Sequence, residues 1–70
     1  MDYIVVIEQA DDGGFAAYVP DLPGCVAAGE SREQTEQLIR EAIPLHVESL
    51  REHGEPIPHP RTTVTTVTAA

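Results

Sequence analysis

The sequence predicts a small α+β domain: a three-stranded antiparallel β-meander, then one long helix and a short C-terminal edge strand, in the order β-β-β-α-β. Two observations predict the elements. Short apolar runs typical of strands occupy residues 3–8, 15–19 and 25–29, and the last of these leads into a pattern of helical period. A run rich in Thr and Val at 61–68 has strand propensity and closes the order.

The length limits how much core the chain can build. Seventy residues form one domain, and a domain of this size buries only about 60% of the surface of its unfolded chain. Cys25 is the only cysteine, so no disulfide can form within the chain, and the three histidines lack the spacing of a zinc site. Oligomerisation is the remaining means of stabilisation, and we therefore expect a homo-oligomer.

The cysteine usage and the N-terminus bear on location. A lone cysteine fits a reducing cytosol, which indicates a cytoplasmic protein. The chain starts with "MDYIVV", which has an acid where a secretory signal carries lysines. No run approaches the roughly 20 apolar residues of a membrane span, so we expect no membrane association.

The charge is strongly acidic. Twelve Asp and Glu oppose four Lys and Arg, for a formal net charge of -8. Such a surface repels phosphate backbones, so direct nucleic-acid binding is not expected. It attracts a basic partner and speeds encounter with it. Acidity that serves only to keep a small protein in solution is an equally open interpretation.

The first two strands have a hairpin signal between them. The run 3–8 is apolar on both faces, which indicates a strand covered on both sides or placed in an interface. Asp12-Gly13 between two apolar runs predicts a type I′ turn with positive φ at both central residues, with Gly14 following. The run 15–19 then pairs back on the first strand.

A rigid corner joins the second strand to the third. Pro20 and Pro23 remove backbone donors and Gly24 supplies conformational freedom. We expect this corner to leave Asp21 and Leu22 projecting from a fixed turn. The small residues of the third strand, 25–29, allow a helix to pack closely.

The helix begins after Ser31, which forms a capping box with Gln34. Its apolar stripe recurs at helical spacing and comprises Leu38, Ile39, Ala42, Ile43, His46, Val47 and Leu50. Pro44 removes one hydrogen bond, but the periodicity stays in phase across it, which predicts one kinked helix. Gly54 is the expected residue just past the C-terminal end.

The final residues are poorly patterned. In a regular strand over 61–68, Val64 and Val67 would face opposite sides. An edge strand, a strand exchanged with a partner and a flexible tail all stay open. We divide the chain into a domain over 1–60 and a C-terminal edge strand or tail of the same domain over 61–70.

Three motifs in order carry a family resemblance: "DGGF" at 12–15, "PDLPGC" at 20–25 and "GEPIP" at 54–58. With them, the chain resembles the HicB-like antitoxin family of prokaryotic type II toxin–antitoxin pairs from Tyr3 to about Pro60. The resemblance implies a partial RNase H-like fold, an antiparallel sheet with one helix across it. It also implies a partner, a small basic mRNA-cleaving toxin of the HicA type whose active site the antitoxin covers.

The resemblance leaves one function out and one alternative open. Many family members carry a C-terminal helix-turn-helix or ribbon-helix-helix segment that binds their own operator. The ten residues after Pro60 contain no basic helix, so operator binding is not expected of this chain. The alternative function is a stand-alone oligomeric regulatory or ligand-binding domain without a cognate toxin.

Acids held by rigid turns are the candidate toxin contacts, because preorganised groups lose less entropy on binding. They are Asp11, Asp12 and Asp21. Glu48 and Glu52, on the outer helix face, are second candidates. The alternative is that all five are merely solvated.

A metal-dependent nuclease is the weakest hypothesis. Its chemistry needs several carboxylates converging on two metal ions, and the first strand has no acid at its middle. The acids near strand ends are Asp2, Glu8, Asp11, Asp12, Asp21 and Glu30. His46 reads as a core-edge residue, His53 lies too far along the helix to share a metal with it, and Cys25 reads as a small buried hydrophobe. We predict no enzyme activity, no metal and no cofactor.

Overall fold

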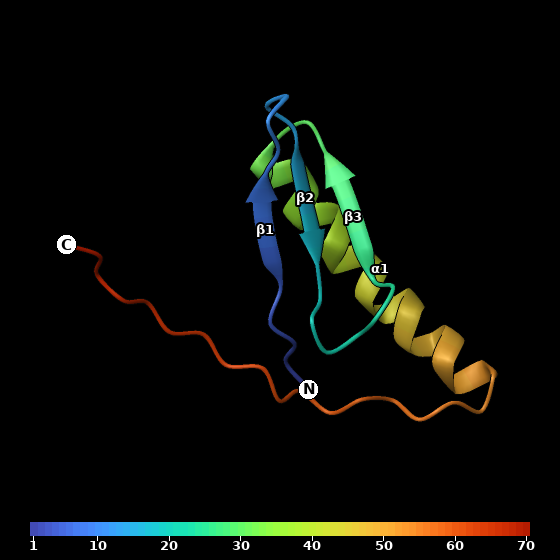
Figure 1. Ribbon diagram of the computed structural model, residues 1–70. Coiled ribbons are helices and arrows are strands. Elements are labelled where there is room, and N and C mark those ends of the chain that lie inside the picture. The colour runs from blue at the N-terminus through green and yellow to red at the C-terminus, as the bar shows by residue number, and fades with distance from the viewer.

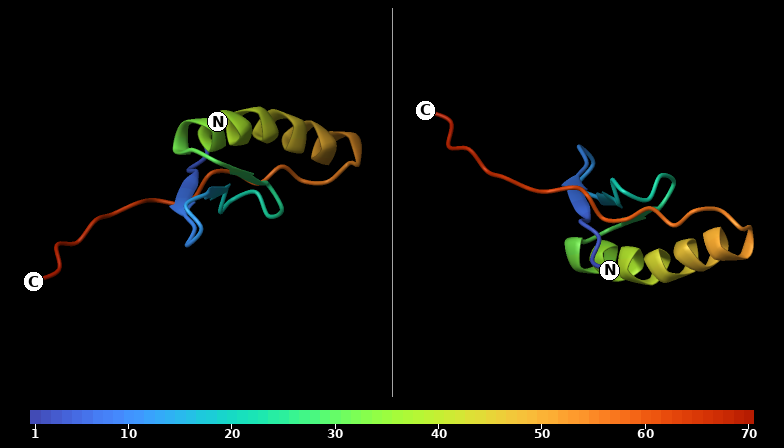
Figure 2. Two further views of the ribbon diagram at one scale, coloured as in Figure 1. Left: turned by 90° about the horizontal axis from the view of Figure 1, so that it is seen from above. Right: turned by 90° about the horizontal axis from the view of Figure 1, so that it is seen from below.

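A computed structural model describes residues 1–70 and shows four elements, β1 (Val6–Gln9), β2 (Phe15–Tyr18), β3 (Val26–Gly29) and α1 (Arg32–Glu52). The strands form one antiparallel sheet in the order β1-β2-β3. Figure 1 shows α1 running behind the sheet, and Figure 2 shows that it covers one face only. The predicted α+β meander followed by one long helix is confirmed.

The first strand is shorter than the predicted run. Its pairing with β2 begins at Val6 opposite Tyr18, and the next residue of the chain, Val19, gives its N–H to the carbonyl of Cys25 on the β3 side. Upstream of β1, the Tyr3 hydroxyl donates to the carbonyl of Pro58. The start of the chain is therefore held by the C-terminal segment rather than by the sheet.

The hairpin between β1 and β2 is not of type I′. Gly13 is the only one of its residues with positive φ, at 91°, so Asp12 does not adopt the conformation that type I′ requires. The N–H of Gly13 donates to the carbonyl of Ala10 at 3.0 Å, and the N–H of Ala10 donates to the carbonyl of Gly14 at 2.7 Å. These bonds define a three-residue loop with a left-handed last residue. The Asp12 carboxylate supports it by accepting from the N–H of Gly14 at 2.9 Å.

The helix starts and stops where its capping signals predict. The Ser31 hydroxyl accepts from the N–H of Gln34 at 3.0 Å, and the amide oxygen of Gln34 accepts from the N–H of Glu30 at 2.7 Å. α1 continues through Pro44 as one helix. It ends at Glu52, and Gly54, two residues further on, has a φ of 66°. The N–H groups of residues 54 and 55 donate to the carbonyls of residues 51 and 50. This is the Schellman arrangement that satisfies the last helical carbonyls.

The core is thin, as the length predicts. Six of the 70 residues are buried, namely Ala17, Val19, Leu22, Cys25, Thr35 and Ile39. The expectation that Leu22 projects is wrong, because its exposed fraction is 0%. Two successive turns, in which Leu22 donates to the carbonyl of Val19 and accepts from Cys25, fold the corner inward beneath the helix.

No strand follows α1, so the predicted C-terminal edge strand at 61–68 is absent. Figure 1 shows the chain after the helix crossing the end of the sheet near the N-terminus and then leaving the body. The radius of gyration is 13.6 Å, against about 11 Å for a compact chain of this length. Hydrogen bonds to Tyr3 and Asp21 hold residues 58–62 at the end of the sheet. Residues 63–70 lead away from that point and do not run beside a strand.

Candidate functional site

Asp21, a predicted toxin contact, is occupied within its own chain. Its carboxylate accepts from the backbone N–H groups of Arg61 at 3.0 Å and Thr62 at 3.1 Å, and from the Thr62 hydroxyl at 2.8 Å. The bond from the Arg61 N–H is the largest of the effects that hold the pKa of Asp21 below its usual value. The proline-rich corner thus anchors the C-terminal segment, a role that the sequence did not reveal.

The five predicted acids do not form one site. Asp11 and Asp12 lie in the hairpin loop, at the end of the sheet opposite to the corner that carries Asp21. Glu48 forms an exposed ion pair with Arg51 at 3.0 Å, and Glu52 makes no ion pair. They lie in three places: Asp11 and Asp12 on the hairpin loop, Asp21 at the corner, and Glu48 and Glu52 on one surface of α1.

That surface is the outer helix face, which we define by residues spaced three or four apart: Leu38, Glu41, Leu45, Glu48 and Glu52. It lies away from the sheet, because the buried residues Thr35 and Ile39 point inward from other positions of α1. Leu45 is 72% exposed and Leu38 is 39% exposed. Leu38 therefore does not belong to the core stripe predicted for it. The sequence did offer one sign of an apolar residue on this face: Leu45 falls outside the predicted core stripe.

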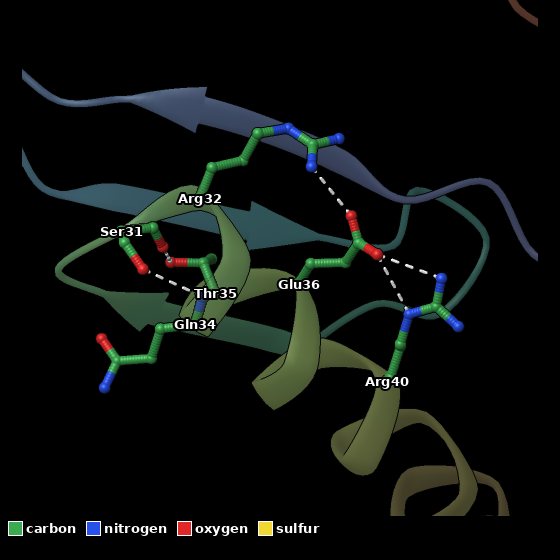
Figure 3. A network of polar contacts seen from close by, with 6 residues as sticks. All are labelled: Ser31, Arg32, Gln34, Thr35, Glu36 and Arg40. Carbon is green, nitrogen blue, oxygen red and sulfur yellow. Dashed lines mark hydrogen bonds and ion pairs between the residues drawn. The ribbon is translucent and has the colours of Figure 1, made fainter.

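A chain of ion pairs crosses the first half of α1 on another side (Figure 3). Glu36 accepts from Arg32 at 2.9 Å and from Arg40 at 3.0 Å. The hydrogen bonds from Arg40 and then Arg32 lower the pKa of Glu36. These three side chains border a groove of about 360 Å³ between α1 and β1, whose apolar lining comprises Tyr3, Val5, Ile7, Ile39 and Ile43.

Nowhere do three or more His, Cys, Asp or Glu side chains gather in a way that could hold a metal ion. Cys25 is buried, and that burial raises the pKa of its thiol, which disfavours the reactive thiolate. No helix is long and apolar enough to cross a membrane.

The architecture defines the class of protein: a small α+β domain in which a single helix backs a three-stranded meander, of the type found in antitoxins. The chain belongs to the family described as the HicB-like antitoxin of bacterial toxin–antitoxin systems, whose sequence profile matches residues 3–70. The family resemblance found from the motifs is therefore confirmed.

Individual relatives agree with this assignment. The crystal structure of the N-terminal domain of the Burkholderia pseudomallei antitoxin HicB superposes with a TM-score of 0.71 at 34% identity, covering 84% of this chain and 69% of that one. A UPF0150 protein of Thermoplasma acidophilum is 41% identical over 58 residues, covering 83% of this chain and 84% of the relative. Antitoxin HicB 1 of Photorhabdus laumondii is 32% identical over 60 residues, which are 86% of this chain and 39% of that antitoxin.

Proposed function

We propose that this chain is an antitoxin that binds a small basic mRNA-cleaving toxin of the HicA type and masks it, without catalysing a reaction itself. The observation that carries the proposal is the family match over residues 3–70. The likeness to the N-terminal domain of an antitoxin HicB, at 34% identity, supports it further. The net charge of -8 supports a basic partner, because a toxin that holds RNA presents a positive face.

The outer helix face is the proposed toxin contact. Interfaces draw their affinity from a few apolar anchors surrounded by a polar rim. Leu45 is the most exposed leucine of the chain, and the carboxylates of Glu41, Glu48 and Glu52 lie around it at helical spacing. Leu45 would supply the anchor, and the carboxylates would steer encounter with a basic surface.

The three acids in turns, Asp11, Asp12 and Asp21, are proposed to have smaller roles in toxin binding. Asp11 and Asp12 are exposed and held by the hairpin loop, so they remain a second contact that acts mainly on association rate. Asp21 contributes through its hold on residues 61 and 62 rather than by touching the toxin. The free, buried Cys25 favours the cytoplasm, where an mRNA-cleaving toxin would act.

The test uses the small basic protein encoded next to this chain's gene. Purified together, the two are expected to form a complex in which mRNA cleavage stops. Glu48→Gln combined with Glu52→Gln is expected to slow association several-fold, and Leu45→Ala to speed dissociation. Glu30→Gln combined with Glu33→Gln is the matched control, because it removes two exposed carboxylates elsewhere on the chain.

Two results would contradict the proposal. Without such a neighbour, or with one that does not bind, the stand-alone oligomeric regulatory or ligand-binding domain becomes the better interpretation. Cleavage of RNA by the purified chain with magnesium or manganese, above a contamination control, would show that it is an enzyme. We also propose that the chain self-associates.

A further inference from the structure

Residues 63–70, which we call the arm, have no partner in their own chain. Six of these eight residues are Thr or Val, whose branched side chains favour strands. The backbone of the arm is unpaired, and Val64 and Val67 are 68% and 87% exposed. Figure 1 shows the arm extending away from the domain, beyond the point where Asp21 holds Thr62. The arm therefore has the composition of a β-strand but pairs with no sheet in its own chain.

The groove between α1 and β1 lacks a cover. α1 packs most against β3 and least against β1, so the helix leaves the outer side of β1 open. The apolar side chains there, among them Tyr3, Val5 and Ile7, are only partly buried. β1 is also an edge strand, so the N–H and C=O groups along its free side are not paired with another strand.

The arm fits this edge by its pattern. Ile4 and Val6 alternate with the groove residues Val5 and Ile7, so the segment 4–7, which leads into β1 and forms its first two residues, has apolar groups on both faces. A neighbouring strand must therefore be apolar on both faces. Val64 and Val67 are three residues apart and point to opposite faces of a regular strand. This three-residue spacing cannot place both valines on one buried face of a strand. It does give one apolar side chain to each face, as this edge requires.

The charges at the groove also favour the arm of another copy. Two chains of charge -8 repel each other over most of their surfaces. The groove lining has two cations, Arg32 and Arg40, against one acid, Glu36, so the groove is locally positive, while the exposed Glu8 of β1 lies on the other face of the strand. The arm carries no charged side chain and adds no repulsion.

We propose that two copies of this chain exchange arms, each laying residues 63–70 along β1 of the other, with Val64 and Val67 on the two faces of the strand. The occupant is a second copy because the root of the arm is fixed at residues 61 and 62, from which it leads away from its own domain. Reciprocal exchange is a closed two-fold arrangement and pairs the β1 edge of both sheets.

Sedimentation equilibrium of the full chain tests the exchange. The wild type is expected at twice its mass of 7.6 kDa, and Val64→Asp combined with Val67→Asp at 7.6 kDa, with the helical signal in circular dichroism unchanged. Val26→Asp is the matched control, because Val26 on β3 is 64% exposed, close to the 68% of Val64. It should remain dimeric. A monomeric wild type would overturn the proposal. So would a dimer that Val26→Asp disrupts but that the double substitution of Val64 and Val67 leaves intact.

A mixing experiment separates exchange from folding back. A spin label at position 69, introduced as Ala69→Cys in a Cys25→Ser background, is placed on unlabelled protein and mixed with isotope-labelled wild type. Broadening of the Val6–Gln9 amides in the mixture is expected. Broadening only when label and isotope share one chain would show that the arm covers its own β1 and would refute the exchange. Toxin binding is independent, because the outer helix face is unchanged in the arm variants.

Discussion

The carboxylate of Asp21 holds Thr62, 41 positions further along the chain, by two hydrogen bonds, from its backbone N–H at 3.1 Å and from its hydroxyl at 2.8 Å. A third bond comes from the N–H of Arg61, and the Tyr3 hydroxyl holds Pro58 nearby. One side chain of the corner therefore fixes the root of the arm. The direction in which the arm leaves the domain depends on it.

Asp21→Asn is expected to free the root of the arm while the sheet and helix stay folded. An amide offers one acceptor atom where the carboxylate offers two charged ones, so the bonds to residues 61 and 62 weaken. Hydrogen exchange at these two amides should become much faster than in the wild type. Asp11→Asn, an exposed loop substitution, is the control and should leave both amides protected. Unchanged protection in Asp21→Asn would contradict this role.

Acid should release the same segment. The pKa of Asp21 is lowered in the folded chain, above all by the Arg61 N–H, so its stabilising contribution is present above its unfolded pKa and lost as pH falls through the lower, folded value. Glu36, whose pKa is lowered by Arg40 and Arg32, acts in the same direction. Titration by NMR below pH 4 should show the amides of residues 61 and 62 shifting with the Asp21 carboxyl. Amides that shift near pH 7 instead would point to a different group.

Gly29→Ala is expected to destabilise the domain by about 1–3 kcal/mol through overpacking. A methyl group there would lie 2.7 Å from the Thr35 hydroxyl and 2.9 Å from the amide oxygen of Gln34, where β3 meets the start of α1. In a Thr35→Ala background the nearest of these contacts disappears, so the same substitution should cost less. Urea denaturation of the four proteins of this cycle measures the coupling. Equal costs in both backgrounds would exclude this contact as the cause.

Leu22→Ala and Leu45→Ala should differ sharply in the free energy of unfolding. Leu22 is fully buried, and its truncation is expected to cost about 2–5 kcal/mol, enough to unfold much of a domain this small. Leu45 is 72% exposed, and its truncation should change stability by no more than about 0.5 kcal/mol. Thermal and urea denaturation compare the two. A large loss for Leu45→Ala would mean that the outer helix face is covered in the native assembly.

Salt should act in opposite directions on the two proposed interactions. Between 50 and 500 mM salt the Debye length falls from roughly 14 to about 4 Å. Association with a basic toxin should then slow several-fold, whereas the dimer of two acidic chains should tighten because their repulsion is screened. Stopped-flow kinetics and sedimentation at both salt concentrations measure the two effects. A toxin association rate indifferent to salt would refute electrostatic steering.

The elements governed by local signals were predictable. The capping box at Ser31, the helical stripe and Gly54 fixed the ends of α1, because each acts over a few residues of chain. The hairpin was predicted in place but not in type. Asp12-Gly13 indicates a turn there, whereas the loop length that the pairing of Gln9 with Phe15 imposes selects the type.

The candidate site was predictable only in part. Glu48 and Glu52 lie on the outer helix face, as helical periodicity places them. Periodicity could not show that Leu45 beside them is exposed and Leu38 partly so, because that depends on where the sheet lies against the helix. The groove beside β1 was beyond sequence reasoning for the same reason: the offset of α1 toward β3 opens it.

The sequence by itself determined the order of strands and helix, the family, the acidity and the small size of the core. These follow from length, composition, motifs, short-range periodicity and capping. Only the tertiary structure decided that Leu22 turns inward, that Asp21 binds residues 61 and 62, and that the Thr- and Val-rich end forms no strand in its own chain. Each of these outcomes joins the corner to the core or to residues about 40 positions away. No local preference specifies such contacts, because they depend on which distant groups the packed sheet and helix bring within hydrogen-bonding distance.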